Sequence, residues 1–149
     1  DARGYMVTGW ASEDGRWYYY GSSGGQASGW TKAGGSWYYL DPLTGAMASG
    51  WTKVRGTWYH LSSSGAMTTG WLREGSTWFY LSPSGAMVTG WARVGSTWYH
   101  FGDGGAMSTG WLEEGGSWYY LSSSGAMVTG SRWINGTRYV FDDQGRLLQ

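Results

Sequence analysis

The sequence predicts an all-β fold in which β-hairpins of about 20 residues stack as a solenoid. A Gly-Trp dipeptide recurs along the chain, with its tryptophan at Trp10, Trp30, Trp51, Trp71, Trp91 and Trp111. A second tryptophan follows seven residues later in each copy, namely Trp17, Trp37, Trp58, Trp78, Trp98 and Trp118. The midpoint between the two tryptophans holds a glycine, which favours tight hairpin loops, at Ala33-Gly34, Glu74-Gly75, Val94-Gly95 and Glu114-Gly115.

This period accounts for the whole chain and leaves no residues for another domain. Copies are 20 residues apart except for one extra residue in the turn at 41–45, and an exposed turn tolerates such an insertion. We expect a single array of a partial repeat, six full repeats and a divergent C-terminal cap, at residues 1–8, 9–28, 29–49, 50–69, 70–89, 90–109, 110–129 and 130–149.

Each repeat is typical of a β-hairpin, because aromatic runs bounded by Gly and Ser are strand signals. A loop midway between the paired tryptophans places Trp71 directly opposite Trp78. Side chains alternate along a strand, so Phe79 points to the other face and Tyr80 returns to the tryptophan face. A lone hairpin is marginally stable in water, so we expect neighbouring hairpins to stack and bury one another's aromatic rings.

The two ends of the chain differ from the full repeats. In the cap, Ser131 and Arg138 replace the paired tryptophans, and Asn135-Gly136 is a strong type I′ turn signal. The segment 4–9 is similar to the tail of a preceding copy, and the first residues do not form a signal peptide. We therefore expect this chain to be part of a longer protein.

Composition excludes several other classes. The chain has 149 residues with 28 Gly, 13 Trp and 12 Tyr, which is too aromatic for disorder and lacks the Gly-X-Y period of collagen. Ten basic and ten acidic residues cancel, which argues against a nucleic-acid partner. There is no cysteine and no apolar run long enough for a spanning helix, so we predict no thiolate metal site and no membrane span.

The paired tryptophans have two interpretations. They could simply form the core, since the repeat has few other large apolar side chains. However, all twelve paired positions of the six full copies are Trp, where a core would also accept Leu, Ile or Val. The cap, which has no following hairpin, loses both tryptophans together. This pattern favours a pair that acts as one unit with the next hairpin, as the walls of an aromatic cage for a quaternary ammonium cation.

The third wall is expected from the residue after the second tryptophan, because it is aromatic in every copy. The Met of Gly-Ala-Met could line the floor, and Met as plain filler is an equally good interpretation. We predict six sites, with Gln26 at the methionine position of the first: Trp10, Trp17 and Tyr38; Trp30, Trp37, Met47 and Tyr59; Trp51, Trp58, Met67 and Phe79; Trp71, Trp78, Met87 and Tyr99; Trp91, Trp98, Met107 and Tyr119; and Trp111, Trp118, Met127 and Tyr139.

A single cage of this kind binds weakly. One cation–π contact contributes ~0.5 to ~2 kcal/mol, so three walls correspond to roughly millimolar affinity. Several cages on one array that faces a repetitive polymer gain ~10² to ~10⁴ in avidity. The number of repeats and the weakness of each site are therefore consistent with each other.

The pattern Gly-Trp-x6-Trp-Tyr-Tyr-Leu-x4-Gly-Ala-Met-x2-Gly-Trp resembles the choline-binding repeats of autolysins, phage lysins and surface proteins of pneumococci and related Gram-positive bacteria. The resemblance covers nearly the whole chain, with departures at Gln26, at Phe79 and in the cap. It implies a left-handed β-solenoid that binds choline of teichoic acids between consecutive hairpins. It also implies an extracellular, wall-associated location, an attached domain such as a murein hydrolase or adhesin, and choline-promoted homodimers.

Two alternatives stay open. The repeats are also similar to glucan-binding repeats of streptococcal glucosyltransferases and to receptor-binding repeats of clostridial toxins, and aromatic platforms stack on sugar rings. A structural spacer that binds no choline is the third possibility.

Catalysis is not predicted, because no acid, base and nucleophile converge. His60 and His100 occupy a strand position that is Tyr in other copies, and we interpret them as surface or packing residues, since neither has an acidic partner at a fixed offset. The acidic residues near the hairpin tips are interpreted as solvated loop ends: Glu13, Asp14, Glu74, Glu113 and Glu114. No cofactor or metal is expected.

Overall fold

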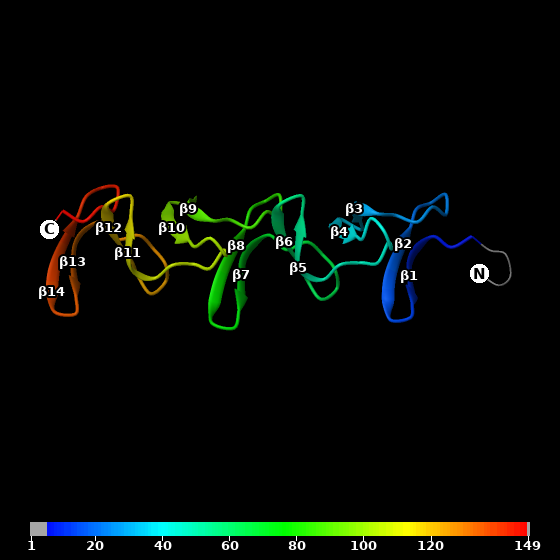
Figure 1. Cartoon of the computed structure of the whole chain (residues 1–149), viewed down its shortest axis with the longest axis horizontal. Coiled ribbons are helices and arrows are strands. Elements are labelled where there is room, and N and C mark those ends of the chain that lie inside the picture. The colour runs from blue at the N-terminus through cyan, green and yellow to red at the C-terminus, as the bar shows by residue number, and fades with distance from the viewer. Residues whose placement is uncertain (1–5, 149) are drawn as a thin grey trace. The chain divides into compact units, whose positions relative to one another are not determined.

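The structure, a computed structural model, describes residues 6–148 and consists of antiparallel two-stranded hairpins (Figure 1). The strands are β1 (Gly9–Glu13), β2 (Arg16–Tyr20), β3 (Gly29–Ala33), β4 (Ser36–Leu40), β5 (Gly50–Val54), β6 (Thr57–Leu61), β7 (Gly70–Glu74), β8 (Thr77–Leu81), β9 (Gly90–Val94), β10 (Thr97–Phe101), β11 (Gly110–Glu114), β12 (Ser117–Leu121), β13 (Gly130–Ile134) and β14 (Thr137–Phe141). The predicted all-β fold of hairpin repeats is confirmed. Residues 1–5 of the predicted partial repeat and residue 149 of the predicted cap lie outside the described residues.

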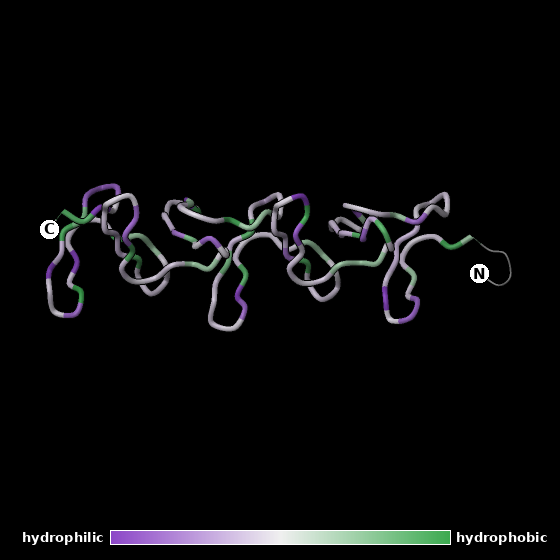
Figure 2. Tube along the Cα trace, viewed as in Figure 1, coloured by the Kyte–Doolittle hydropathy of each residue, from purple (hydrophilic) through white to green (hydrophobic). Residues whose placement is uncertain are grey.

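The chain forms two compact units. The first contains the residues up to Gly70 together with Leu81–Met87, and the second contains Trp71–Tyr80 together with the residues from Val88 onward. In both units each hairpin is followed by a polar turn and a short tail, and each tail before β13 leads to the next hairpin. Figure 2 shows hydrophilic residues at hairpin tips, for example in β1–β2 and β13–β14.

The hairpin loops begin one residue later than predicted, which changes the strand register. Trp30 pairs with Tyr39, and Trp37 pairs with Lys32, so the two tryptophans are diagonal neighbours instead of opposite each other. The loop is Gly34-Gly35, with positive φ at both residues (59° and 88°), as a type I′ turn requires. The expectation that Trp71 lies directly opposite Trp78 is therefore wrong. Their ring centroids are 6.2 Å apart, against 5.1 Å between Trp71 and Tyr80.

The buried core does not consist of the tryptophans. Its largest side chains come from the last residue of the second strand in most hairpins, and all are at most 2% exposed: Leu40, Leu61, Leu81, Phe101, Leu121 and Phe141. In the cap, Phe141 also packs with Val128 and Ile134. The backbone of the same residue pairs with its own tail in isolated β-bridges, for example Leu61↔Met67 and Leu121↔Met127.

Within each compact unit, the tail of a repeat also joins its hairpin to the preceding one. Ala48 N–H donates to Tyr39 O within the same repeat at 2.8 Å, while Met47 N–H donates to Trp17 O of the previous hairpin at 2.8 Å. The same bond recurs between Met107 and Trp78 at 2.8 Å. These bonds stack consecutive hairpins within a unit and satisfy backbone groups that would otherwise lack a partner.

Candidate functional site

Three pockets in the structure are built in the same way from three consecutive repeats. Each is lined by two tryptophans of one hairpin, a tyrosine and a methionine of the next repeat, and two turn residues of the repeat after that. The first contains Trp10, Trp17, Tyr38, Met47, Ser63 and Ser64; the second contains Trp71, Trp78, Tyr99, Met107, Ser123 and Ser124; the third contains Trp91, Trp98, Tyr119, Met127, Asp143 and Gln144. Their volumes are about 360, 350 and 280 Å³, so two lie at the lower end of the ~300–1,000 Å³ of small-molecule sites and the third lies just below it.

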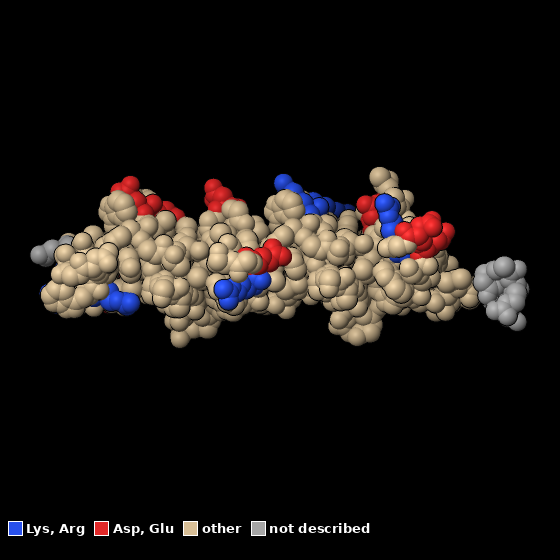
Figure 3. Space-filling view, turned by 90° about the horizontal axis from the view of Figure 1, so that it is seen from below, with Lys and Arg blue, Asp and Glu red and all other residues tan. Residues whose placement is uncertain are grey.

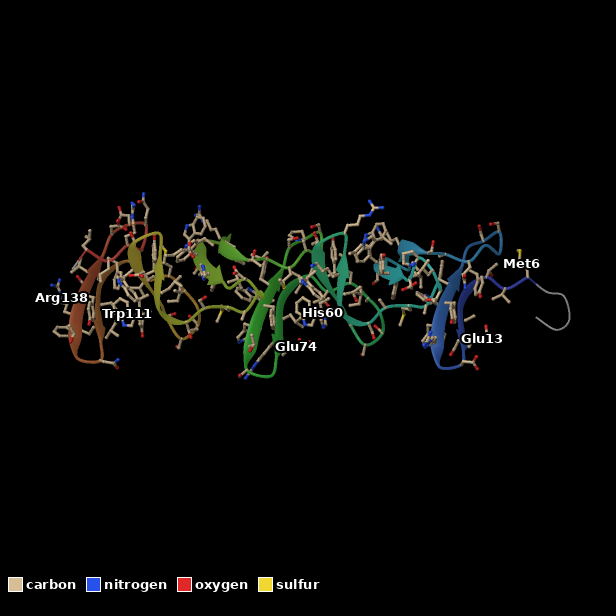
Figure 4. All side chains as sticks on the ribbon, in the orientation of Figure 1. Met6, Glu13, His60, Glu74, Trp111 and Arg138 are labelled. Atoms are coloured by element: carbon tan, nitrogen blue, oxygen red, sulfur yellow. The ribbon has the colours of Figure 1, made fainter. Side chains whose placement is uncertain are left out.

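The aromatic rings of a pocket contact one another edge to face, so that their planes enclose an angular space. In the second pocket, the planes of Trp71 and Trp78 are 87° apart, and those of Trp71 and Tyr99 are 72° apart, with centroids at 6.2 and 4.9 Å. The cap repeats this arrangement, where Trp111 lies 6.3 Å from Trp118 and 4.9 Å from Tyr139. Figure 4 shows the rings that surround Trp111, between the β11–β12 and β13–β14 hairpins. The negative faces of two or three rings thus border one space.

The third ring comes from the residue after the second tryptophan of a hairpin, and it contacts the first tryptophan of the preceding hairpin. Trp10 and Tyr38 have centroids 4.7 Å apart, and Trp30 and Tyr59 are 4.8 Å apart. Trp91 lies 4.9 Å from Tyr119. Trp51 and Trp58 belong to the first compact unit and Phe79 to the second, so the site predicted from these three residues stays a prediction.

The methionines lie one junction earlier than predicted. Met47 lines the pocket of Trp10 and Trp17, where Gln26 was expected, and Met107 replaces the predicted Met87 in the pocket of Trp71. Likewise Met127, and not Met107, lines the pocket of Trp91 and Trp98. At the other junctions, the backbone N–H groups of Met67, Met87 and Leu147 donate to the carbonyl oxygens of Trp37, Trp58 and Trp118, respectively. The backbone bond from each tail to the preceding hairpin causes this shift. The first pocket therefore has a methionine, and the junction of Trp118 receives Leu147.

The tryptophans are not packed solidly against one another. Trp71 is 37% and Trp78 38% exposed, and the second tryptophan of the first pocket, Trp17, is 46% exposed. A residue that served only as core would be buried like Leu81, which is fully inaccessible. The second tryptophan of each pair is exposed, whereas Trp10, Trp30, Trp51 and Trp91 are half-buried. The exposed rings favour the binding interpretation over a plain core.

The chain's own cations already lie over two of these rings. The guanidinium carbon of Arg73 is 5.9 Å from the centroid of Trp78, and Nζ of Lys53 is 6.0 Å from that of Trp58. Both distances are within the range of a cation–π interaction. The outer faces of these indoles are thus suited to positive charge. On the face seen in Figure 3, charged side chains of either sign lie in small separate groups.

Sequence reasoning missed the turn residues at the pocket mouth. They come from the repeat after the one that supplies the tyrosine, so Ser63 and Ser64 lie in the mouth of the pocket of Trp10. The signal in the sequence is the offset from the first tryptophan to this turn, which is 52 positions from Trp71 to Ser123 and from Trp91 to Asp143, and 53 from Trp10 to Ser63 because of the extra residue in the turn at 41–45. The offset carries no information until the stacking of three consecutive repeats is known.

Sequence reasoning also misjudged His100, which does have an acidic partner. His100 is 7% exposed, its Nε2 lies 2.8 Å from Glu114 Oε2, and its Nδ1 lies 2.8 Å from Ser108 Oγ. Glu114 is fourteen residues further along the chain, and Glu74 follows His60 by the same offset. A fixed offset to an acid therefore exists. Glu114 is not merely a solvated loop end, since its Oε1 also accepts a hydrogen bond of 3.0 Å from Trp91 Nε1–H.

Two turn aspartates are held in the ionised form by backbone groups. The N–H groups of Thr44 and Leu43 donate to Asp41 and lower the pKa of its carboxyl from 3.8. The backbone N–H of Arg146 is the main cause that lowers the pKa of Asp142, with smaller contributions from Gln144 N–H and the Arg146 charge. Each ionised carboxylate stabilises its turn above the ordinary pKa, and this contribution is lost as the pH falls through the lowered value.

Substitution of Gly65 by alanine is expected to disturb the first pocket. An added Cβ would lie 2.3 Å from Met47 Sδ, at a residue with φ of +90°, so Met47 must move from the pocket floor. The expected loss is about 1–3 kcal/mol in the free energy of unfolding, measured by urea denaturation. Gly56→Ala is the matched control, because its φ is +84° and nothing lies within 4 Å. Equal losses in the two variants would show that the Met47 contact contributes nothing.

Among residues 6–148, no cluster of three or more His, Cys, Asp or Glu side chains is placed to hold a metal ion. Within the same residues, no helix has the length and apolarity needed to cross a membrane.

Comparison with known families identifies the repeat. Residues 7–50, 48–89 and 88–130 match the family model of the choline-binding repeat. No curated protein sequence gives a match.

Several solved structures are similar to the chain. CbpJ of Streptococcus pneumoniae is 43% identical with a TM-score of 0.92, over 95% of this chain and 52% of CbpJ. Choline binding protein F of the same organism, in the presence of a peptidoglycan analogue, is 42% identical with a TM-score of 0.91, over 98% of this chain and 48% of that protein. The same protein has also been solved with ipratropium. The modular autolysin LytC of S. pneumoniae, with a synthetic peptidoglycan ligand, is 34% identical with a TM-score of 0.73, over 99% of this chain and 34% of LytC. The chain thus spans about half the length of the first two relatives.

Proposed function

Because the chain belongs to the choline-binding repeat family, we propose that its aromatic pockets bind the choline groups of teichoic acids and so anchor an attached protein at a bacterial surface. One observation supports this proposal most strongly. Three pockets combine two partly exposed indoles, a phenol ring and a methionine in the same arrangement.

The ligand chemistry follows from the ring faces. A trimethylammonium group has no N–H to donate, so it gains little from hydrogen-bond acceptors and is best recognised by several π faces together. The thioether of Met47 or Met107 adds polarisable apolar contact for the methyl groups. Three such contacts correspond to roughly millimolar affinity per pocket. The complex of choline binding protein F with ipratropium, a quaternary ammonium compound, supports the same chemistry.

We assign one choline to each junction within a compact unit. With the methionines in their observed positions, the proposed ligand-binding residues are Trp10, Trp17, Tyr38 and Met47; Trp30, Trp37, Tyr59 and Met67; Trp71, Trp78, Tyr99 and Met107; Trp91, Trp98, Tyr119 and Met127; and Trp111, Trp118, Tyr139 and Leu147. The site expected from Trp51, Trp58 and Phe79 stays a prediction. Repetition on one chain converts weak pockets into firm attachment to a polymer that carries many cholines.

The proposed role is that of a non-catalytic module. The chain spans about half of its first relatives and a third of the modular autolysin LytC, which supports an attached domain in a longer protein. An extracellular, wall-associated location and choline-promoted dimers belong to the same proposal. Teichoic acid is favoured over free choline as the biological ligand, because only a polymer benefits from several pockets at once.

A choline titration tests the proposal. We expect Trp fluorescence and calorimetry to report about four to six cholines per chain with millimolar affinity. The chain should also be retained on an immobilised tertiary amine and released by free choline. Retention on dextran instead, without release by choline, would favour the glucan-binding alternative. No response at tens of millimolar choline would leave only a structural spacer.

A further inference from the structure

The pocket of Trp91 differs from the pocket of Trp71 in its charged neighbours. Glu114 Oε1 accepts a hydrogen bond of 3.0 Å from Trp91 Nε1–H, and Asp143 lines the mouth of the same pocket. At the corresponding mouth, the pocket of Trp71 has Ser123 and Ser124, and its described lining residues are all uncharged. The Trp91 pocket thus has one carboxylate in its lining and a second one hydrogen-bonded to Trp91, whereas the charged group nearest to a wall of the Trp71 pocket is the Arg73 guanidinium, 5.9 Å from the Trp78 ring centroid.

From the second hairpin onward, a glutamate occurs at this position of a repeat only after a hairpin that has histidine beside its first tryptophan. His100 lies opposite Trp91, and Glu114 follows His100 by fourteen positions. Tyr80 lies beside Trp71, and the residue fourteen positions after Tyr80 is Val94. Glu74 follows His60 by the same offset, and Ala33 and Ile134 follow a Tyr by fourteen positions. Val54 holds the equivalent strand-end position fifteen residues after Tyr39, because the turn at 41–45 has one extra residue. Histidine and glutamate therefore occur together in this array, which indicates a cooperative arrangement.

His100 fixes the position of this carboxylate. Its Nε2 lies 2.8 Å from Glu114 Oε2, and its Nδ1 lies 2.8 Å from Ser108 Oγ, so a neutral ring can donate to Glu114 while it accepts from the serine hydroxyl. His100 is also stacked edge to face on Trp91, with centroids 5.0 Å apart. The glutamate side chain is 48% exposed, but its two oxygens are held by Trp91 and His100.

We propose that Glu114, with a contribution from Asp143, makes the Trp91 pocket more selective for cations over neutral ligands than the Trp71 pocket. A carboxylate that accepts the indole N–H pushes electron density into the ring and makes its face more negative. Its full charge also attracts a nearby cation directly. A neutral ligand of the same shape gains from neither effect. The inference rests on the proposed function, and it assigns Glu114 as a residue that tunes specificity without a contact to the ligand.

The test compares two pockets in one molecule. The indole N–H cross-peaks of Trp71 and Trp91, assigned from Trp→Phe variants, are followed by NMR during titration with choline and with its neutral isostere 3,3-dimethylbutan-1-ol. We expect the preference for choline over the isostere to be about threefold larger at Trp91 than at Trp71. Glu114→Gln keeps an oxygen that can accept from Trp91 but removes the charge, so it should remove most of the difference between the Trp91 and Trp71 preferences, and the part that remains is due to Asp143. The Trp91 N–H resonance should also move upfield.

Several variants separate charge from structure. Glu113→Gln removes a neighbouring charge from the same strand, opposite Trp118, and should leave the Trp91 preference unchanged. Asp143→Asn lies in an exposed turn and should lower the preference at Trp91 by a smaller factor. Tyr80→His combined with Val94→Glu should raise the preference at Trp71. An unchanged preference at Trp91 in both Glu114→Gln and Asp143→Asn, while Trp71 still binds choline, would overturn this inference and leave the proposed function intact. Failure of both pockets to bind choline would instead reject the proposed function.

Discussion

Trp71→Ala is expected to abolish one choline pocket and to lower the calorimetric stoichiometry by about one ligand per chain. Trp71 is the central ring of its pocket, because its centroid lies within 6.2 Å of Trp78 and within 4.9 Å of Tyr99. Loss of one wall removes up to ~2 kcal/mol of cation–π energy, or about 30-fold in affinity, which makes a millimolar pocket undetectable.

The structural role of Trp71 must be separated from its role in binding, because its ring also contacts Phe101 at 5.8 Å. Trp78→Ala serves this purpose, since it removes the other indole wall of the same pocket, with the same expected loss of about one ligand. Trp133→Ala is the control: this indole is 68% exposed and lies on β13, where the cap lacks the paired tryptophans. Unchanged stoichiometry in both pocket variants would reject the assignment of the site.

Leu121→Ala is expected to cause the largest loss of stability, about 2–5 kcal/mol in the free energy of unfolding. The Leu121 side chain is fully buried at the end of β12, and the backbone of Leu121 forms a β-bridge with Met127 of its own tail. A smaller side chain leaves a cavity between the hairpin and the tail. Because the tail positions Met127 in the Trp91 pocket, choline affinity there should fall together with stability.

Urea denaturation followed by circular dichroism measures this loss. Leu43→Ala is the matched control, because the same deletion at a side chain that is 96% exposed should change stability by less than about 0.5 kcal/mol. Repeat arrays unfold by local units, so the Leu121 variant should also show a broader transition as the hairpins around it unfold first. Similar losses in the two leucine variants would show that the core does not reside at the strand ends.

The candidate site could be predicted from the sequence only in part. The third ring was found because its aromatic character recurs at one offset, and the structure places Tyr38 and Tyr99 beside the expected tryptophans. The methionine was assigned to the wrong junction, because closeness along the chain suggested its own repeat. The backbone bond from Met47 to Trp17 instead sets its place, and no side-chain pattern reveals such a bond.

The sequence alone determined the features that depend on local chemistry repeated at a constant period. These are the hairpins, the paired tryptophans and the divergent cap, because turn glycines and strand aromatics act over a few residues and recur in every copy. Tertiary contacts set the strand register, the burial of the leucines, the methionine of each pocket and the hydrogen bond between Glu114 and Trp91. The physical reason is that each of these depends on how one repeat packs on the next, where a one-residue change in loop position or a single backbone hydrogen bond selects the neighbours.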